Sequence, residues 1–250
     1  MLHKEREEEI LNLLQITNGF VTVKQLCEKL FASESSIRRD LKALEEGGLV
    51  KRSYGGASPA VSFSNIVTFN HRTRQNVDAK RDIAKKAATL VPDGAILILD
   101  QSSTAFFLAN ELMARNSLTV ITNNIEIMML LSNTRIKLIS SGGVLSEENR
   151  NCLIGGDAQH TFENIFADLA FFSVRAIAED GMVADCSREE VLVRNAMLKN
   201  AGRRVLLCDS SKFGARAPYK QCGLEDVDYL ISEGTAAERF SSRWDTLQLL

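Results

Sequence analysis

The sequence lacks the segments that would place a protein in a membrane or send it out of the cell. No apolar run reaches the roughly 18 residues that a membrane-spanning helix needs. The first residues of the chain are mostly charged, where a signal peptide requires an apolar stretch. We therefore expect a cytoplasmic protein that does not associate with a membrane.

The sequence also lacks a strong net charge and the cysteine spacing of a metal site. Lys and Arg number 30 against 32 Asp and Glu, which gives a formal net charge of −2 over 250 residues. This excludes a uniformly basic nucleic-acid binder, so any affinity for DNA must come from a local patch. The 5 cysteines include no C-x-x-C pair and have no histidine at metal-ligand spacing. We expect reduced, mostly buried thiols, with neither a metal nor a cofactor bound.

Residues 1–57 show the order of elements of a winged helix-turn-helix domain. Apolar residues at helical spacing predict two short helices, separated over residues 19–23 by a turn and a short β-segment. A third helix is predicted to begin after Ser33, a suitable N-cap, and to end at Gly47 and Gly48. Residues 49–54, followed by two glycines, then predict a strand, a basic hairpin tip and a turn.

The rest of the chain predicts a linker over residues 58–68 and a larger α/β domain over residues 69–250. The linker is expected because this stretch is small, polar and contains a proline. Beyond it, short apolar runs at 95–99, 118–121, 136–139, 169–172 and 205–208 are interspersed with helical patterns at 79–90, 104–113, 124–132 and 188–200. Such alternation predicts a mostly parallel sheet flanked by helices, with ligands beyond the carboxyl ends of the strands.

The segment 32–44 has the pattern of a helix that reads DNA. If Ile37, Leu41 and Leu44 are buried, hydroxyl groups and cations remain on the outer face. Hydroxyls near a helix start contact phosphates, and arginine is the side chain best shaped to bind guanine bidentately. Five cations oppose three anions between residues 38 and 52, so this patch is positive. The candidate DNA-binding residues are Ser35, Ser36, Arg38, Arg39, Lys42, Lys51, Arg52 and Tyr54.

Two other interpretations of this segment remain. Cations on a helix that is merely solvated would show the same charge pattern, and a winged helix can also serve protein contacts alone. The complete order of helix, β-segment, helix, basic helix and basic wing favours double-stranded operator DNA as the partner.

Several strings of residues resemble the DeoR family of bacterial transcriptional regulators. The strongest are Ser35-Ser36-Ile37-Arg38-Arg39-Asp40-Leu41 and Arg52-Ser53-Tyr54-Gly55-Gly56-Ala57, although Ala32 and Ser36 stand where the family more often has Val and Thr. The resemblance continues at 69–72, 80–84, 122–124, 141–143 and 209–214. It implies an effector domain similar in fold to ribose-5-phosphate isomerase that binds phosphosugars. It also implies a repressor of a carbohydrate-metabolism operon, acting as a homo-oligomer because operator palindromes mirror protein symmetry.

The residues themselves predict an anion site in the second domain. Residues 100–104 follow a buried strand and open a helix, so hydroxyls and backbone N–H groups would face an incoming phosphate. Helix capping alone would explain these hydroxyls, but polar or glycine-rich segments recur at successive strand ends, which favours a site. The candidate effector-binding residues are Asp100, Ser102, Ser103, Thr104, Thr122, Asn123, Asn124, Gly142, Gly143, Arg175, Glu189, Glu190 and Lys212.

Two of these candidates depart from the family pattern. Ser102 replaces the usual glycine of the phosphate loop, so a backbone conformation with positive φ would be strained. Arg175 belongs to a segment that replaces a glycine-containing turn. It either binds a phosphate or carboxylate of the ligand or pairs on the surface with Glu179 or Asp180.

An active sugar-phosphate isomerase with an accessory DNA-binding domain is the alternative function. Such an enzyme needs a carboxylate base and a positive group that stabilises the enediolate. Phe172 and Arg175 occupy the two positions where the isomerase carries acidic residues, and no lysine lies between Gly181 and Glu190. Glu189 and Glu190 remain and could accept hydrogen bonds from sugar hydroxyls. We therefore predict a regulator that keeps ligand binding and is not an enzyme.

Overall fold

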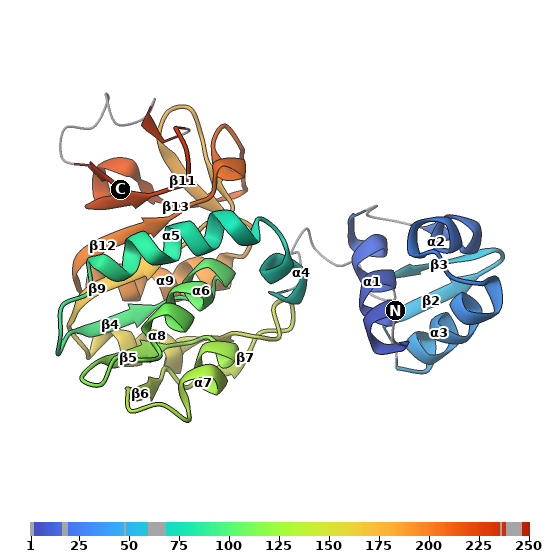
Figure 1. Cartoon of the computed structure of the whole chain (residues 1–250), viewed down its shortest axis with the longest axis horizontal. Helices are drawn as coiled ribbons and strands as arrows, with labels where there is room; N and C mark the ends of the chain where they lie inside the picture. The colour runs from blue at the N-terminus through green and yellow to red at the C-terminus, as the bar shows by residue number, and fades with distance from the viewer. Residues whose placement is uncertain (1–2, 17–19, 48, 60–68, 236, 239–246) are drawn as a thin grey trace. The chain divides into compact units, whose positions relative to one another are not determined.

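The computed structural model describes residues 3–16, 20–47, 49–59, 69–235, 237–238 and 247–250. The chain divides into two compact units, Met1–His71 and Arg72–Leu250. Figure 1 shows the elements of both units, each of which is considered by itself. Within the described ranges, no helix is both long enough and apolar enough to cross a membrane.

The first unit is a winged helix. Its helices are α1 (His3–Ile16), α2 (Val23–Leu30) and α3 (Glu34–Glu46), and its antiparallel sheet has the order β1 (Val21–Thr22), β3 (Gly56–Pro59), β2 (Val50–Ser53). The predicted order of elements is confirmed. The predicted caps of the third helix are confirmed as well, because the Ser33 side chain accepts a hydrogen bond from the Ser36 amide and the helix ends at Gly47. Ile37, Leu41 and Leu44 are buried in the core of this unit.

The two glycines after the wing tip are required for different reasons. Gly55 has a φ of +84°, a conformation that side chains with a Cβ rarely adopt. Gly56 lies so close to β1 that a Cβ would come within 2.3 Å of the Val21 carbonyl oxygen. Together they let the wing turn and then pack directly against β1.

The predicted linker begins too early. Ser58 and Pro59 pair with Lys51 and Val50 in the hairpin of β2 and β3, so they belong to the wing. The remainder of the predicted linker, residues 60–68, lies outside the described residues.

The second unit is built on a seven-stranded sheet in which all neighbouring strands are parallel. Its order is β15 (Gln248–Leu249), β14 (Tyr229–Ile231), β12 (Ala201–Leu207), β9 (Ala167–Phe172), β4 (Ile96–Leu99), β5 (Thr119–Thr122), β6 (Lys137–Ser140). The five predicted runs are confirmed as strands of this sheet, whereas β14 and β15 were not predicted. The sheet therefore extends further than the sequence pattern indicates.

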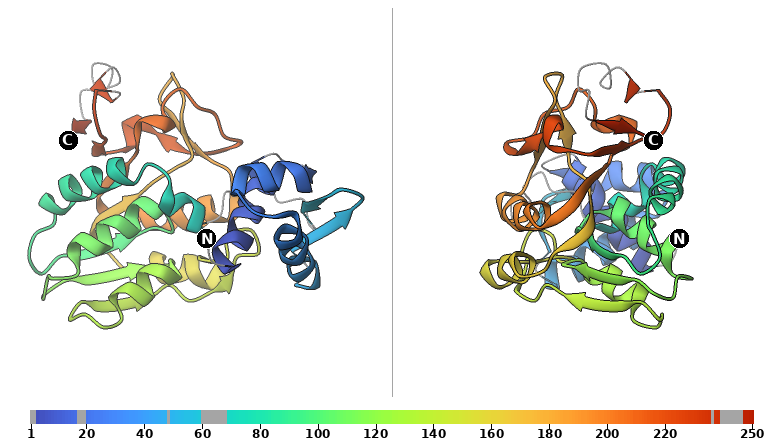
Figure 2. Two further views of the ribbon diagram at one scale, coloured as in Figure 1. Left: turned by 45° about the vertical axis from the view of Figure 1, so that its right-hand side comes forward. Right: turned by 90° about the vertical axis from the view of Figure 1, so that its left-hand side faces the viewer.

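Helices cover both faces of this sheet. They are α5 (Val77–Thr89), α6 (Ser103–Leu112), α7 (Ile125–Leu131), α8 (Gly156–Glu163) and α9 (Arg188–Lys199). A short helix, α4 (Phe69–Arg74), precedes α5. In the right-hand view of Figure 2 the teal and green helices lie on one side of the sheet and the yellow and orange helices on the other. Alternate residues of β9 separate accordingly: Leu169 and Phe171 pack with α5, α6 and α7, whereas Ala170 and Phe172 pack with α8 and α9. Because both faces are buried, the strands read as continuous apolar runs.

Smaller elements complete the unit and were not predicted. A second sheet has the antiparallel order β10 (Ala176–Ile177), β11 (Met182–Asp185), β13 (Tyr219–Gly223), and a hairpin joins β7 (Val144–Leu145) to β8 (Leu153–Ile154). Two single turns of 3₁₀ helix, η1 (Ser210–Lys212) and η2 (Leu224–Asp226), flank β13. The five cysteines are free thiols, two of them buried and three half-buried.

A buried ion pair fastens α1 to α3 in the winged unit. The Arg6 guanidinium donates from Nε to Asp40 Oδ2 at 2.5 Å and from Nη2 to Oδ1 at 3.2 Å. The Asp40 side chain is fully buried and that of Arg6 is 12% exposed. The hydrogen bond to Asp40 is the main reason that the pKa of Arg6 is raised. By contrast, the ion pair of Arg38 with Glu34 on α3 is more than half exposed.

We expect Asp40→Asn to destabilise the winged unit by about 1.5–3 kcal/mol, because the substitution removes a charged partner from a buried guanidinium. Glu34→Gln, which removes the exposed pair, should change the stability by less than about 0.5 kcal/mol. Hydrogen exchange of the α1 and α3 amides in the full chain measures both effects. Equal protection in the two variants would contradict this ranking.

Candidate functional site

The candidate DNA-binding residues lie together on α3 and the wing. Arg38, Arg39 and Lys42 are exposed on α3, and Lys51 and Arg52 are exposed on β2. Tyr54, at the tip of the hairpin, is fully exposed. A shallow hollow is lined jointly by residues of α3 and of the wing, among them Arg38, Arg52 and Tyr54. The structure thus forms one basic surface from two segments that are separate in the sequence.

Hydroxyl groups gather where α3 begins. The Ser33 hydroxyl lies 3.1 Å from that of Ser35 and 2.9 Å from that of Ser36. Ser35 is exposed and Ser36 is half-buried. Because the first N–H groups of a helix have no intrahelical acceptor, this cluster and the helix start are together suited to a DNA phosphate.

The cations of this surface are only weakly engaged by neighbouring carboxylates. Arg38 lies 2.6 Å from Glu34, Lys42 lies 3.8 Å from Glu46, and Arg52 lies 3.6 Å from Glu45. Exposed ion pairs of this kind contribute roughly 0–1 kcal/mol each. Phosphates and base edges of DNA can therefore replace these carboxylates at little cost.

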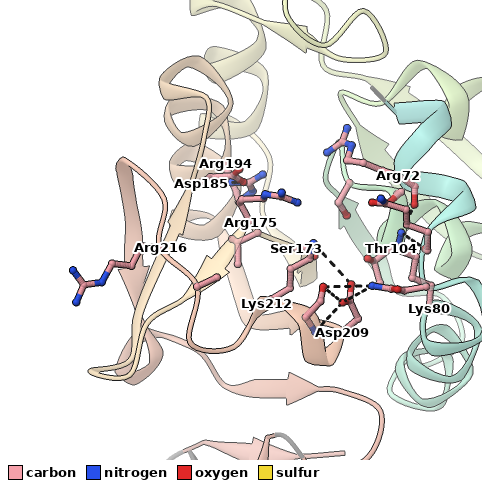
Figure 3. Close-up of a pocket in the computed structure, with 17 residues that line it drawn as sticks. Arg72, Lys80, Thr104, Ser173, Arg175, Asp185, Arg194, Asp209, Lys212 and Arg216 are labelled. Atoms are coloured by element: carbon pink, nitrogen blue, oxygen red, sulfur yellow. Dashed lines mark hydrogen bonds and ion pairs between the residues drawn. The ribbon is translucent and has the colours of Figure 1, made fainter. Parts of the chain in front are cut away.

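The second unit contains a polar cavity of about 550 Å³ over the carboxyl ends of the central strands (Figure 3). Its walls come from the corner between α4 and α5, the start of α6, the β9–β10 connection, β11, α9 and the segment after β12. The residues that line it are Arg72, Gln75, Asn76, Lys80, Ser102, Ser103, Thr104, Ser173, Val174, Arg175, Asp185, Arg194, Asp209, Ser211, Lys212, Ala215 and Arg216.

A buried ion pair forms the floor of this cavity. Asp100 Oδ2 accepts hydrogen bonds from Arg194 Nε and from the Ser173 amide, both at 3.1 Å. Its Oδ1 accepts from the Ser102 amide at 3.0 Å. Arg194 Nη1 also lies 3.0 Å from Asp185 Oδ2. One carboxylate thus fixes both the start of α6 and the β9–β10 connection.

The Arg194 guanidinium stays charged in this floor. Burial disfavours its charge, but the carboxylates of Asp185 and Asp100 outweigh burial and raise the pKa of Arg194. Burial raises the pKa of Asp185, although Arg194 opposes that shift. The floor is therefore a compact cluster of charges rather than an apolar surface.

Two further charged groups lie in the cavity wall. The Lys80 ammonium is nearly buried and donates to the carbonyl oxygens of Gln75, at 2.8 Å, and Arg72. Burial lowers the pKa of Lys80 to about 8. Asp209 accepts hydrogen bonds from Asn76 Nδ2 at 2.9 Å and from the Ser211 amide and hydroxyl. Burial acts to raise the pKa of Asp209, but the hydrogen bonds from Ser211 and the nearby charge of Lys212 lower it overall.

The structure brings five of the candidate effector-binding residues to the cavity: Ser102, Ser103, Thr104, Arg175 and Lys212. The strain expected at Ser102 does not arise, so that expectation was wrong. Ser102 has a φ of −76° and acts as the N-cap of α6, accepting from the Ala105 amide. A serine is therefore well suited to this position.

The candidates after β5 and β6 do not line the cavity. Asn124 caps α7, Thr122 accepts from the Asn124 amide, and Asn123 donates to Gln101 and to the Leu153 carbonyl. Gly142 and Gly143 form the turn that leads from β6 to β7, where both have positive φ. These loops lie elsewhere because β6 is an edge strand and β5 is next to it, while the cavity spans β12, β9 and β4, and neighbouring strands are about 4.8 Å apart.

The remaining candidates also lie outside the cavity. Asp100 is paired with Arg194 in the floor of the cavity but does not itself line the cavity. Glu190 is buried and accepts from Gln101 Nε2 and Asn149 Nδ2, both at 2.9 Å. Glu189 is exposed on the first turn of α9. Adjacent residues on a helix face different directions, so these two glutamates do not act together.

Several lining residues were missed by sequence reasoning. Arg72, Lys80 and Asp209 belong to strings that carried the family resemblance, yet no role was given to them. Arg194 had a signal of its own, an arginine within a stretch from Val191 to Met197 that is apolar apart from Asn195. A buried arginine on an apolar face requires buried carboxylates, which here are Asp100 and Asp185.

A winged helix with a basic reading surface, joined in one chain to an α/β unit with a charged cavity, defines a transcriptional regulator with a separate sensor unit. Residues 6–62 match the family model of the DeoR-like helix-turn-helix domain, and residues 75–234 match that of the DeoR C terminal sensor domain. The chain belongs to the DeoR family.

Known members of the family are similar over nearly their whole length. The HTH-type transcriptional regulator GolR of Listeria innocua is 36% identical over 92% of this chain and 90% of that protein. The HTH-type transcriptional repressor GlcR of Bacillus subtilis is 32% identical over 98% and 94%. The glycerol-3-phosphate regulon repressor of Haemophilus influenzae is 31% identical over 91% and 88%.

Among solved structures, ribose 5-phosphate isomerase A of Methanocaldococcus jannaschii is similar with a TM-score of 0.43 and 23% identity, over 56% of this chain and 55% of that chain. A similarity this low assigns no activity. The relatives named above are regulators, and the second unit matches a sensor domain, so the regulator is favoured over the isomerase.

We expect Arg38→Ala and Arg39→Ala each to weaken specific operator binding by roughly 1–3 kcal/mol, because each removes a guanidinium placed to bind a base edge. Lys51→Ala and Arg52→Ala should weaken binding to all sequences alike and flatten its dependence on salt. Fluorescence anisotropy, with an operator selected by the protein from random DNA, measures both. Lys85→Ala, an exposed lysine of the second unit, is the control. Normal operator binding by both arginine variants would refute the assignment of α3.

Proposed function

We propose that this regulator represses a carbohydrate-metabolism operon in the cytoplasm, and that a phosphorylated sugar in the cavity of the second unit modulates its binding to operator DNA. The observation that carries the proposal is the start of α6, which opens into a cavity lined by six cationic side chains. We further propose a homo-oligomer, since a symmetric operator is read by a symmetric protein.

The start of α6 is suited to a phosphate group. Ser102 caps the helix, so the N–H groups of the first turn beyond it have no intrahelical acceptor and their dipoles favour an anion. The hydroxyls of Ser103 and Thr104 stand at the same place, and both residues line the cavity. Lys80 and Lys212 supply positive charge to the same cavity. Together these groups provide both the hydrogen bonds and the charge that a phosphate requires.

The remaining polar groups are suited to sugar hydroxyls. Asp185 is 15% exposed and can accept hydrogen bonds, while Gln75 and Asn76 offer amide groups at the corner between α4 and α5. The name of one relative, a repressor of the glycerol-3-phosphate regulon, is consistent with control by a small phosphorylated molecule.

The isomerase alternative receives less support from the cavity. Asp185 is engaged by Arg194 at 3.0 Å, and Asp209 is engaged by Asn76 and Ser211. Both carboxylates are thus tied to neighbouring donors, whereas a general base must be free to take a proton from substrate. Phe172 is buried in the core between the sheet and its helices.

We expect Lys212→Met to weaken effector binding about ten- to hundredfold, the equivalent of a charged hydrogen bond of roughly 1.5–3 kcal/mol. The Lys212 side chain is 18% exposed and its ammonium is 4.0 Å from Asp209, so it is held only loosely by protein. Operator affinity without effector should stay near that of the unmodified chain.

The effector for this test is the phosphorylated sugar that most raises the melting temperature in a thermal-shift screen, since ligand at 100 times its Kd stabilises by about 2.7 kcal/mol. Calorimetry then gives effector affinity and anisotropy gives operator affinity for the same variant. Lys220→Met, an exposed lysine on β13 that does not line the cavity, is the matched control. Unchanged effector affinity in Lys212→Met refutes the site, whereas loss of both activities identifies a structural lysine.

We expect effector affinity to fall as the pH rises from 7 to 9. The pKa of Lys80 is about 8 in the free protein, and a neighbouring phosphate favours the charged form, so binding near pH 8 takes up a proton. Calorimetry in two buffers with different ionisation enthalpies measures this uptake directly. Lys80→Arg, which stays charged throughout, should abolish it. Equal heats in both buffers for the unmodified chain would contradict a contact between Lys80 and the phosphate.

A further inference from the structure

The cavity carries a surplus of positive charge. Six lining side chains are cationic, and only Asp185 and Asp209 among the lining residues are acidic. Including the buried carboxylates of Asp100 and Glu190, which both act on Arg194, four carboxylates oppose six cations, which leaves a surplus of two positive charges. A phosphate monoester supplies about −1.5 to −2 at neutral pH. A single phosphate would therefore balance the total charge, but only the cations that can reach it would be neutralised directly.

The surplus is not distributed evenly over the cavity. The charge of Arg194 is met by Asp100 and Asp185, and that of Lys212 is met in part by Asp209. Arg175 and Arg216 are different: in the part of the chain that the structure describes, the side chain of neither forms a hydrogen bond or ion pair. Among the described residues, Arg175 thus forms no surface ion pair with Glu179 or Asp180, which was the alternative that the sequence left open.

Arg175 also lies apart from the groups suited to the first phosphate. Figure 3 shows Thr104 and Lys80 on one side of the cavity and Arg175 on the other. Lys212 and Asp209 lie between the two sides. A single phosphate at the start of α6 would therefore be met by one side of the cavity and leave the other side empty.

The backbone around Arg175 is held in place although its side chain is exposed. Asp100 fixes the Ser173 amide at 3.1 Å, Val174 is buried, and Ala176 begins strand β10. The guanidinium therefore projects from a rigid segment and has a defined reach. A planar guanidinium binds carboxylate and phosphate groups through paired hydrogen bonds.

We propose that the effector carries a second anionic group, a phosphate or a carboxylate, which Arg175 binds across the cavity from the α6 phosphate site. The ligand class is thus a sugar bisphosphate or a phosphorylated sugar acid. This inference rests on the proposed function, because it presupposes that a phosphorylated sugar occupies the cavity. Arg216, at the rim of the same side, adds positive potential there.

Matched pairs of ligands test this proposal on the full chain by calorimetry. 6-Phosphogluconate is compared with glucose 6-phosphate, from which it differs by a carboxylate, and fructose 1,6-bisphosphate is compared with fructose 6-phosphate, from which it differs by a phosphate. In at least one pair the ligand with two anionic groups should bind about tenfold or more tightly than the monophosphate. The pair that shows the preference distinguishes a carboxylate from a second phosphate.

Variants assign the preference to one side chain. Arg175→Gln should reduce the preference within the pair to less than about threefold, while the affinity for the monophosphate stays within about threefold of the unmodified chain. Arg135→Gln replaces an exposed arginine that does not line the cavity and should change neither value. Lys212→Met should weaken both members of the pair together.

Each outcome decides the proposal. Equal affinity within both pairs, or a preference that survives Arg175→Gln, overturns the second anionic site and leaves the phosphosugar proposal in place. Absence of binding by all four ligands at millimolar concentration counts against the second site and against the phosphosugar effector together. A preference that disappears only in Arg175→Gln supports the proposal.

Discussion

The buried ion pair of Asp100 with Arg194 joins three segments on which the sensor cavity depends. Asp100 follows β4, Arg194 comes from α9, and the Ser173 amide that shares the carboxylate follows β9. Removing one partner of a fully buried pair leaves the other charge without compensation, which costs roughly 3–5 kcal/mol. The pair therefore constrains how these segments can be arranged. It also positions the start of α6, because the Ser102 amide donates to the same carboxylate.

The winged unit also contains an ion pair with a buried carboxylate that joins two segments. Asp40 is buried on the inner side of α3 and is held by Arg6 of α1, while the neighbouring Arg39 faces outward. The adjacent residues Arg39 and Asp40 of the family string thus have two different roles. Arg39 faces solvent, and Asp40 anchors α3 to the core. In both units, the helix that faces the partner or ligand is positioned by a carboxylate that the partner never needs to touch.

Much of this architecture could be predicted from the sequence because its signals are local. Caps, glycine stops and helical spacing identified α3 and the wing, and continuous apolar runs identified five strands of the large sheet. Strand order is not a local property, so the loops after β5 and β6 were expected at the cavity although they lie toward the edge of the sheet. The second sheet escaped prediction because β10 has only two residues and β13 (Tyr219–Gly223) is mostly polar, so neither forms an apolar run. Arg194 was missed for a different reason, since its burial depends on Asp100, which is 94 positions away in the sequence.

One small junction determines how the DNA-reading surface can move. Thr22 pairs with Gly56 of the wing and at the same time caps α2, where its side chain accepts from the Gln25 amide. The next residue, Val23, donates its amide to the Gly55 carbonyl at 2.8 Å. Tilting the wing would therefore disturb the cap of α2, so the wing and α2 are coupled at this junction. A displacement of the wing on DNA is thus transmitted directly to the start of α2.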